Sequence, residues 1–120
     1  MIDSPPAIIC QAPRAVDGDT IRCANLPVRV RLLGIDAPEL PGHCRKGRTC
    51  TPGDGARSTR ILAGLLAAGR ITVHPSGQDR YGRMLATASL TLHRGRIDLS
   101  CQMLKLQAAV PRYSRLNCRG

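Results

Sequence analysis

Short stretches of alternating apolar and polar residues, separated by turn-forming residues, run through most of this chain and are typical of a β-rich protein. Residues 7–16 are apolar and extended, and Asp17-Gly18 is a hairpin turn signal before a return strand at residues 20–23. A third strand begins at Val28, where three apolar residues alternate with Arg29 and Arg31. The first third of the chain therefore predicts three consecutive strands in a meander.

The pattern changes to a helical one after a loop at residues 40–55 that is rich in Pro, Gly and basic residues. A helix is predicted from about residue 52 to residue 68, with Thr51 as its N-cap and Gly69 after its end. The apolar stripe of this helix consists of Leu62, Leu65 and Leu66. The helix is thus the next regular element after the third strand.

Two more strands and a second helix complete the pattern. Residues 71–74 and 84–92 read as the fourth and fifth strands, joined by a polar turn at residues 78–83. Asp98 is the predicted N-cap of a second helix that runs to about Gln107. The residues after position 109 carry no strong pattern.

This order of elements predicts an α+β, mainly β fold. Five short strands, with a helix after the third strand and a second helix after the fifth, fit a Greek-key barrel of the oligonucleotide-binding (OB) type. A length of 120 residues fits a single domain over residues 1–120, with its core at about 7–113 and a tail at 114–120. We expect a monomer.

Six cysteines in a small basic chain favour disulfides and an oxidising compartment. Across the first hairpin a Cys10–Cys23 bridge is geometrically cheap, and a Cys44–Cys50 bridge would close the loop locally. A Cys101–Cys118 bridge follows by elimination. The alternative is a zinc site built from His43 with Cys44 and Cys50, which offers at most three ligands and contains no CxxC pair.

The charge balance narrows the range of partners. Lys and Arg number 18 against 8 Asp and Glu, and all but Lys46 and Lys105 of the basic residues are arginines, which bind phosphate bidentately. A polyanion such as nucleic acid is the natural partner; a membrane surface or simple solubility are the alternatives. No apolar run is long enough to cross a membrane, and the chain has no amphipathic basic helix with an aromatic face. Residues 1–6 lack the features of a signal peptide, so we expect a secreted or periplasmic precursor to carry one that is absent here.

Four of the eight carboxylates fall between positions 17 and 39, at a turn and at a strand end. Carboxylates that cluster in this way repel one another unless a cation lies between them, and a hard divalent ion with oxygen ligands is the economical candidate. The alternative is that Asp17 and Asp19 only form a turn and that Asp36 pairs with Arg31. On a regular strand Arg31 and Asp36 would point to opposite faces, so either Gly34 marks a bend or Asp36 lies beyond the strand.

Three stretches together resemble the motifs of the staphylococcal-nuclease-like (thermonuclease) family. They are Val16-Asp17-Gly18-Asp19-Thr20, Arg31-Leu32-Leu33-Gly34-Ile35-Asp36-Ala37-Pro38-Glu39 and Asp79-Arg80-Tyr81-Gly82-Arg83. The resemblance covers about residues 12 to 113. It implies calcium-dependent hydrolysis of phosphodiester bonds in DNA, RNA or both, with little sequence specificity and with single-stranded or denatured substrates favoured.

The resemblance also implies a role for each matching residue. Asp19, Asp36 and the backbone carbonyl of Ala37 match the calcium ligands. Glu39 matches the carboxylate that orients or deprotonates the attacking water, and Arg31 and Arg83 match the arginines on the reacting phosphate. The substrate-binding positions are matched by Arg80, Tyr81 and Tyr113.

The chain also departs from the family pattern. It ends before a further helix that the family usually has, and its cysteines are not part of the parent pattern, which suggests an exported version stapled by disulfides. The alternative function is a nucleic-acid-binding module that keeps the fold without catalysis. The retained carboxylates favour the enzyme, because a pure binder has no need of them.

Overall fold

The computed structural model describes residues 5–112 and 116–118. Within these residues the chain forms nine strands and two helices. The strands are β1 (Ile8–Ile9), β2 (Arg14–Asp17), β3 (Thr20–Arg22), β4 (Val30–Leu32), β5 (Ile35–Asp36), β6 (Arg70–Gln78), β7 (Met84–Leu92), β8 (Gly95–Asp98) and β9 (Val110–Pro111). The helices are α1 (Gly55–Ala67), between β5 and β6, and α2 (Leu99–Lys105), between β8 and β9.

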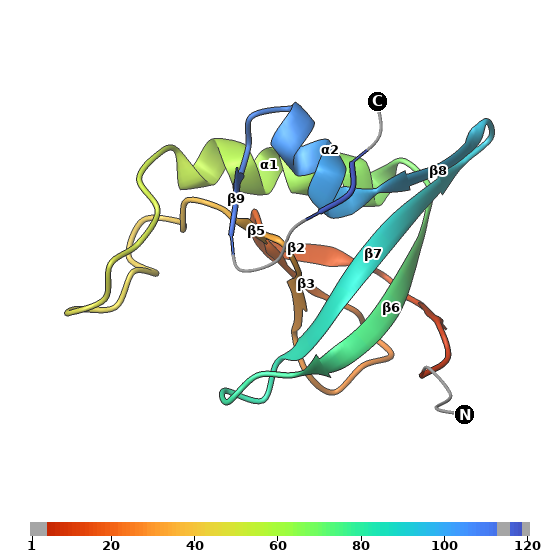
Figure 1. Cartoon of the computed structure of the whole chain (residues 1–120), viewed down its shortest axis with the longest axis horizontal. Coiled ribbons are helices and arrows are strands. Elements are labelled where there is room, and N and C mark those ends of the chain that lie inside the picture. Colours follow the sequence, from red (N-terminus) through yellow and green to blue (C-terminus); the bar gives the residue numbers. More distant parts are fainter. Residues whose placement is uncertain (1–4, 113–115, 119–120) are drawn as a thin grey trace.

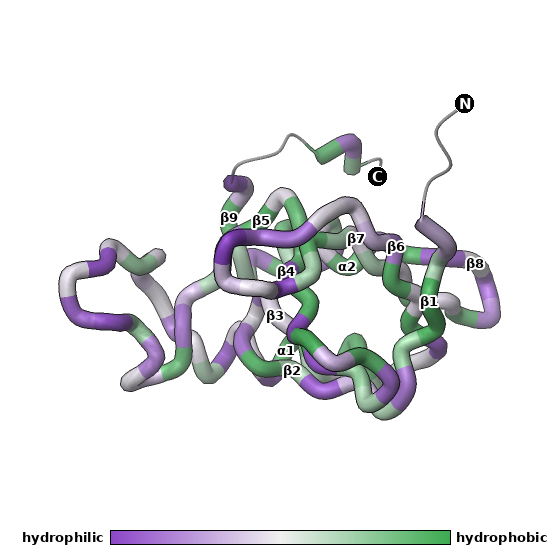
Figure 2. The backbone as a smooth tube through the Cα atoms, turned by 90° about the horizontal axis from the view of Figure 1, so that it is seen from below, coloured by the Kyte–Doolittle hydropathy of each residue, from purple (hydrophilic) through white to green (hydrophobic). Residues whose placement is uncertain are grey.

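The main sheet has the strand order β1-β6-β7-β4-β3-β2, with β8 pairing to β7. The sheet is curled, as the path of the backbone in Figure 2 shows. Apolar side chains from its strands form the core. The contact between β4 and β7 is parallel, and the other pairings are antiparallel. Both helices lie on the same side of the strands in Figure 1. The mainly β fold with two helices is confirmed, whereas the predicted count of five strands is too low.

The first hairpin differs in register from the predicted one. Its turn is at Gly18-Asp19 because Asp17 pairs with Thr20, and a bulge lies between Ala15 and Asp17. Upstream of β2 the chain leaves the hairpin at Ala12, whose φ of 47° is incompatible with a continuous strand. The predicted single strand over residues 7–16 is therefore wrong, and its first part forms β1, which pairs with β6 instead.

Two short strands and one helix start also differ from prediction. Residues 95–98 form β8, a strand that the sequence pattern did not predict, and Val110–Pro111 forms β9 against β5. Helix α1 begins at Gly55, with Asp54 as its N-cap accepting a hydrogen bond from the N–H of Arg57. The predicted cap, Thr51, is wrong because that hydroxyl donates elsewhere. The predicted Asp98 cap of α2 is confirmed.

The structure contains all three predicted disulfides, Cys10–Cys23, Cys44–Cys50 and Cys101–Cys118. The first joins the end of β1 to the end of β3, and Asn25 bonds to both Ile9 and Gln11 beside it. This bridge therefore links the two ends of the curled sheet, β1 and β2–β3, which share no strand pairing. Each disulfide is expected to contribute about 2–4 kcal/mol to stability.

The core is aliphatic, in agreement with the absence of Phe and Trp. Its largest fully buried members come from the sheet and from both helices. They are Ile21, Val30, Leu32, Ile35, Leu62, Ile71, Val73, Leu90, Leu99 and Met103. In the described part of the chain, neither helix has the length and apolar character needed to cross a membrane.

Candidate functional site

Arg31 lies at the end of β4, where the chain bends sharply. Leu33-Gly34 form a turn, and Gly34 has a φ of +85°, a conformation that is costly for residues with a side chain. The bend returns the backbone so that one nitrogen of the Arg31 guanidinium donates to the carbonyls of Leu32 (2.8 Å) and Ile35 (2.9 Å). The other nitrogen bonds to Asp36 at 3.1 Å. The two residues, which a regular strand would separate, therefore meet.

Asp19 approaches the same guanidinium nitrogen as Asp36. Its Oδ2 is 3.5 Å from the Arg31 nitrogen and accepts the N–H of Ala37 at 2.9 Å, while Thr20 donates to its Oδ1. Burial raises the pKa of the Asp19 carboxyl above its ordinary value of 3.8. The guanidinium and the two hydrogen bonds act in the opposite direction but do not offset burial. The carboxylate is thus held at a desolvated position, where a nearby positive charge stabilises it.

Asp36 has two partners that the sequence analysis did not identify. Thr51 donates its hydroxyl to Asp36 Oδ2, and the Arg112 Nε lies 3.4 Å from the same oxygen. Both residues are distant from Asp36 in the sequence and belong to no motif, so no sequence signal pointed to them. Arg112 reaches the site because β9 pairs with β5 and its N–H donates to the carbonyl of Gly34.

The donor set around Arg31 fits a hard divalent cation. Two carboxylates face the same guanidinium nitrogen, and the Ala37 peptide lies against one of them. All the donors are oxygen atoms, which Ca²⁺ prefers. In this structure Arg31 and Arg112 compensate the two carboxylates, so a bound cation would take over a role that these guanidinium groups fill here.

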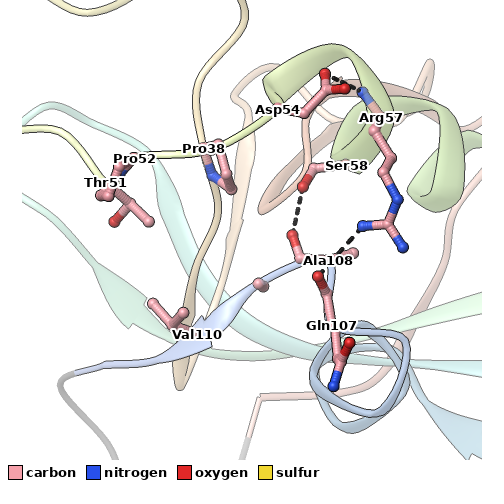
Figure 3. A pocket seen from close by; sticks show the side chains of 11 residues that line it. Pro38, Thr51, Pro52, Asp54, Arg57, Ser58, Gln107, Ala108 and Val110 are labelled. Carbon is pink, nitrogen blue, oxygen red and sulfur yellow. Dashed lines mark hydrogen bonds between the residues drawn. The ribbon is translucent and has the colours of Figure 1, made fainter.

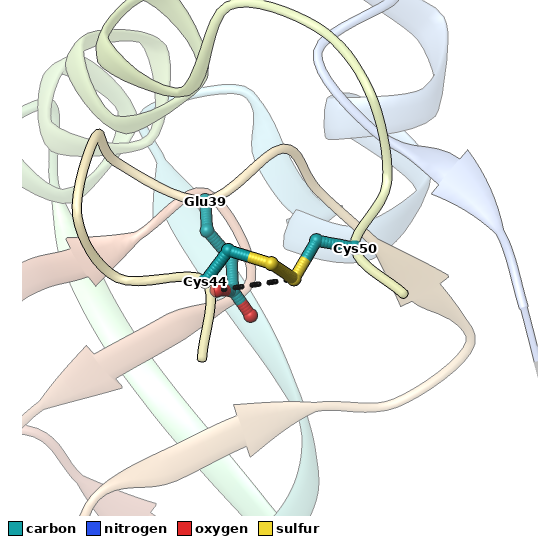
Figure 4. A group of neighbouring side chains, drawn as sticks. All are labelled: Glu39, Cys44 and Cys50. Atoms are coloured by element: carbon teal, nitrogen blue, oxygen red, sulfur yellow. Dashed lines mark hydrogen bonds between the residues drawn. A yellow bond between two sulfur atoms is a disulfide. The ribbon is translucent and has the colours of Figure 1, made fainter. Parts of the chain in front are cut away.

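Glu39 lies in a different setting, beside the Cys44–Cys50 loop (Figure 4). Its Oε1 pairs with Arg48 at 3.1 Å, and its Oε2 is 3.7 Å from the Sγ of Cys50. Among the described residues, Glu39, Cys44 and Cys50 are the one group of three that approaches a metal-site arrangement. Both sulfur atoms belong to a disulfide and cannot act as thiolate ligands, so the alternative of a zinc site here is wrong.

The start of this loop is attached to the first hairpin through Asp17. Its Oδ1 accepts the N–H of Leu40 at 3.2 Å and lies 3.1 Å from the Nδ1 of His43. The backbone of Glu39 also packs so closely on Gly55 that a Cβ there would overlap the Glu39 carbonyl. These contacts place Glu39 between the turn that carries Asp19 and the start of α1.

The third motif forms the turn between β6 and β7. Asp79 accepts the N–H groups of Tyr81 and Arg83 at 2.9 Å and pairs with the Arg83 Nε at 2.7 Å. The ring of Tyr81, 65% exposed, lies 5.1 Å from the Arg80 guanidinium carbon and 5.8 Å from that of Arg83. An exposed ring between two guanidinium groups is suited to stacking on a nucleobase next to a phosphate.

Arg83 approaches Arg31 through the sheet. Strands β4 and β7 are parallel, with Arg31 opposite Leu85, so Arg83 lies two residues before the partner of Arg31 and on the same face. Two residues along a strand span about 7 Å. The structure therefore brings Asp19, Arg31 and Asp36 into direct contact, with Arg83 close by and Glu39 in the adjoining loop. Tyr113 lies outside the described residues.

Because its hydrogen bonds favour the ionised form, the pKa of Asp79 is lowered from 3.8. Desolvation acts in the opposite direction, but the N–H groups and the guanidinium of Arg83 outweigh it. A carboxyl with a lowered folded-state pKa stabilises the fold above its unfolded pKa, and loses that contribution as the pH falls through the folded value.

We therefore expect Asp79→Asn to lower the free energy of unfolding at pH 7 by about 1 kcal/mol or less, as for other partly exposed ion pairs. The difference between the two chains should shrink as the pH falls below 3.8. Urea unfolding of both chains at pH 7 and at pH 3 measures it. An equal difference at the two pH values would mean that the ionised carboxylate contributes nothing.

A small pocket adjoins the site through Thr51, the residue that donates to Asp36, and Figure 3 shows its lining. It lies between the start of α1 and residues 107–110, and Thr51 and Pro38 form part of its wall. Its volume of about 150 Å³ is well below the roughly 300–1,000 Å³ of typical ligand pockets. The pocket is therefore too small to enclose a typical small-molecule ligand.

Comparison with known proteins shows which family and which relatives the chain resembles. The family model described as staphylococcal nuclease homologue matches residues 29–117. The chain is 40% identical over 76 residues to the protein ParB of Escherichia coli, which covers 62% of this chain and 37% of that relative. It is 40% identical over 81 residues to the probable endonuclease LCL3 of Paracoccidioides lutzii, covering 65% and 22%.

A third relative is an uncharacterized endonuclease of Escherichia coli O157:H7, 39% identical over 74 residues, which cover 60% of this chain and 42% of that relative. The matched region thus spans well under half of the length of these relatives.

Proposed function

Because the chain belongs to the family of staphylococcal nuclease homologues, we propose that it hydrolyses phosphodiester bonds of DNA, RNA or both with the help of Ca²⁺. The observation that carries the proposal is that the carboxylates of Asp19 and Asp36 converge on the guanidinium of Arg31. Relatives named as endonucleases support the same reaction class. We also propose that residues 1–120 form one domain and that the protein acts as a monomer on single-stranded or denatured nucleic acid.

Each residue of the site has a task in this reaction. Asp19, Asp36 and the Ala37 carbonyl would hold Ca²⁺, which when bound supplies positive charge against the developing charge of the phosphoryl oxygens. Arg31 and Arg83 would contact those oxygens through charge-assisted hydrogen bonds. Glu39 would accept a proton from the attacking water. Arg80, Tyr81 and Tyr113 would bind the neighbouring nucleotides.

The ion pair between Glu39 and Arg48 bears on this proposal. Arg48 lies 3.1 Å from the Glu39 Oε1 and would compete with an attacking water for this oxygen, so we propose that it moves away when water binds. Half of the Arg48 side chain is exposed, and it belongs to the disulfide-closed loop. Substrate phosphate is a natural alternative partner for this guanidinium.

The three disulfides support a location in which they persist. Such bonds form and survive in oxidising compartments and are rare in the cytosol. We therefore propose that the protein acts in the periplasm or outside the cell.

The metal requirement can be tested with heat-denatured DNA. We expect cleavage in millimolar CaCl₂ and none in excess EGTA, with recovery when calcium is added back. Calcium should also raise the thermal midpoint of the wild-type chain more than that of Asp36→Asn, because one ligand is lost in the variant. Undiminished cleavage in EGTA would contradict the calcium site, and absence of cleavage with any divalent ion would contradict the nuclease.

A further inference from the structure

Four arginines from four different strands or strand ends lie side by side across the outer face of the sheet. In the β2–β3 hairpin Arg14 is directly opposite Arg22. Strands β3 and β4 pair Ile21 with Val30, so continuing this register by one residue places Arg22 opposite Arg29. We call Arg14, Arg22, Arg29 and Arg83 the arginine row.

The row ends at the proposed catalytic site. Val30 is opposite Met84 in the parallel pair β4–β7, and the Met84 N–H donates to the Arg29 carbonyl at 2.9 Å. The preceding residue, Arg83, is therefore the neighbour of Arg29. Arg31 projects from the same face two residues farther along β4.

Burial shows which way the row faces. Ile21 and Val30, which alternate with the row along their strands, are fully buried in the core. Arg14 and Arg29 are exposed, and Arg22 is partly exposed, so their side chains project to the outside. Among the described residues, Arg14, Arg22 and Arg29 take part in none of the ion pairs.

Like charges directly opposite each other in a sheet repel and destabilise it. Arg14, Arg22 and Arg29 hold three successive positions of this kind without an acidic partner among the described residues, whereas Arg83 pairs with Asp79. The three unpaired positions make a surface on which an anion is favourable. Strands lie about 4.8 Å apart, so the row is about 14 Å long. A stacked nucleic-acid strand places a phosphate every 3.4 Å, and about four phosphates would span this length.

We propose that the arginine row binds the sugar–phosphate backbone of the substrate strand as it leaves the reacting phosphate, from Arg83 across β4 and β3 to Arg14. The direction of the bound strand in this proposal rests on the proposed nuclease function, because it is defined from the reacting phosphate. The binding itself needs neither catalysis nor metal. The row contacts phosphates only and therefore confers affinity without sequence preference.

The test is the affinity of a fluorescein-labelled 16-nucleotide oligothymidylate, measured by fluorescence anisotropy in EGTA at several salt concentrations. The double variant Arg22→Gln/Arg29→Gln should raise the Kd on the order of tenfold and reduce the slope of log K against log salt by about 0.7 for each arginine. A gel shows that the oligonucleotide stays intact during the measurement.

The matched control is Arg94→Gln/Arg96→Gln, which removes the same two charges. These exposed arginines flank the β7–β8 turn, at the opposite end of β7 from the row. The proposal is overturned if the control raises the Kd as much as the row variant, since net charge alone would then account for binding. It is also overturned if the row variant binds like wild type.

Two further measurements distinguish binding by the arginine row from binding at the catalytic site alone and from misfolding of the variant. A labelled dinucleotide is too short to cover the row, so its affinity should change less than that of the 16-mer in the row variant. The thermal midpoint of the row variant should equal or exceed that of wild type, because the substitutions relieve repulsion between neighbouring arginines. A lower midpoint would attribute the weaker binding to misfolding and overturn the proposal. If wild type binds through the row but cleaves nothing in calcium, the nuclease proposal alone fails.

Discussion

Replacing Glu39 with glutamine is expected to lower kcat on denatured DNA by about 10²–10⁴-fold, the usual contribution of a general base. The substitution preserves the shape of the side chain and removes its ability to take a proton. It also breaks the ion pair with Arg48, but half of the Arg48 side chain is exposed, so a stability loss of at most about 1 kcal/mol is expected. Initial rates in calcium, together with urea unfolding, measure both effects.

Arg48→Gln is the matched control for this experiment. It breaks the same ion pair but leaves the Glu39 carboxylate in place and without its guanidinium partner. A large loss in Glu39→Gln with a much smaller change in Arg48→Gln would assign the effect to the carboxylate. If both variants lose the same activity, the pair positions the loop and Glu39 is not the base.

Arg31→Gln is expected to cost both activity and stability. The Arg31 guanidinium is only 11% exposed and bonds to two backbone carbonyls and two carboxylates. Its loss leaves Asp19 without a cationic partner among the described residues and Asp36 with Arg112 alone. The expected cost is about 3 kcal/mol, the lower end of the range for broken buried pairs. Urea unfolding in EGTA measures this cost directly.

Arg83→Gln provides the contrast, since both arginines are proposed to contact the reacting phosphate. Arg83 is 30% exposed and pairs with Asp79 in a surface turn, so its removal should cost about 1 kcal/mol or less while lowering kcat by about 10²–10³-fold. Calcium should restore more stability to Arg31→Gln than to Arg83→Gln because it would compensate the charge of the carboxylates that have lost Arg31. Equal stabilities of the two variants in EGTA would contradict the structural role of Arg31.

The dual role of Arg31 links the fold to the proposed chemistry. Without metal, its guanidinium compensates the carboxylates that would bind the cation. A divalent ion would take over this compensation and leave Arg31 available for phosphate. Substrate and metal binding are thus expected to be mutually favourable. The metal ion would compensate the carboxylates, and the substrate phosphate would pair with the Arg31 guanidinium that the ion releases.

Much of the local structure could be predicted from the residues themselves. The bounds of β7, the Asp98 cap of α2 and the pairing of all six cysteines agree with the sequence pattern. These features depend on period, capping and short-range geometry, which neighbouring residues control. The prediction of β1 and β2 as one strand was wrong because the pairing of β1 with β6 depends on a strand 60 residues farther on.

The sequence by itself determined the aliphatic core, the strongly basic surface and the presence of carboxylates and arginines in three motifs. Only the tertiary structure decided which of these side chains meet. The bend at Gly34 brings Asp36 to Arg31, β9 delivers Arg112, and the registers of β2, β3, β4 and β7 align the arginine row. The reason is physical: a periodic pattern reports which face of a strand is buried, whereas the alignment of distant strands depends on the packing of the whole sheet.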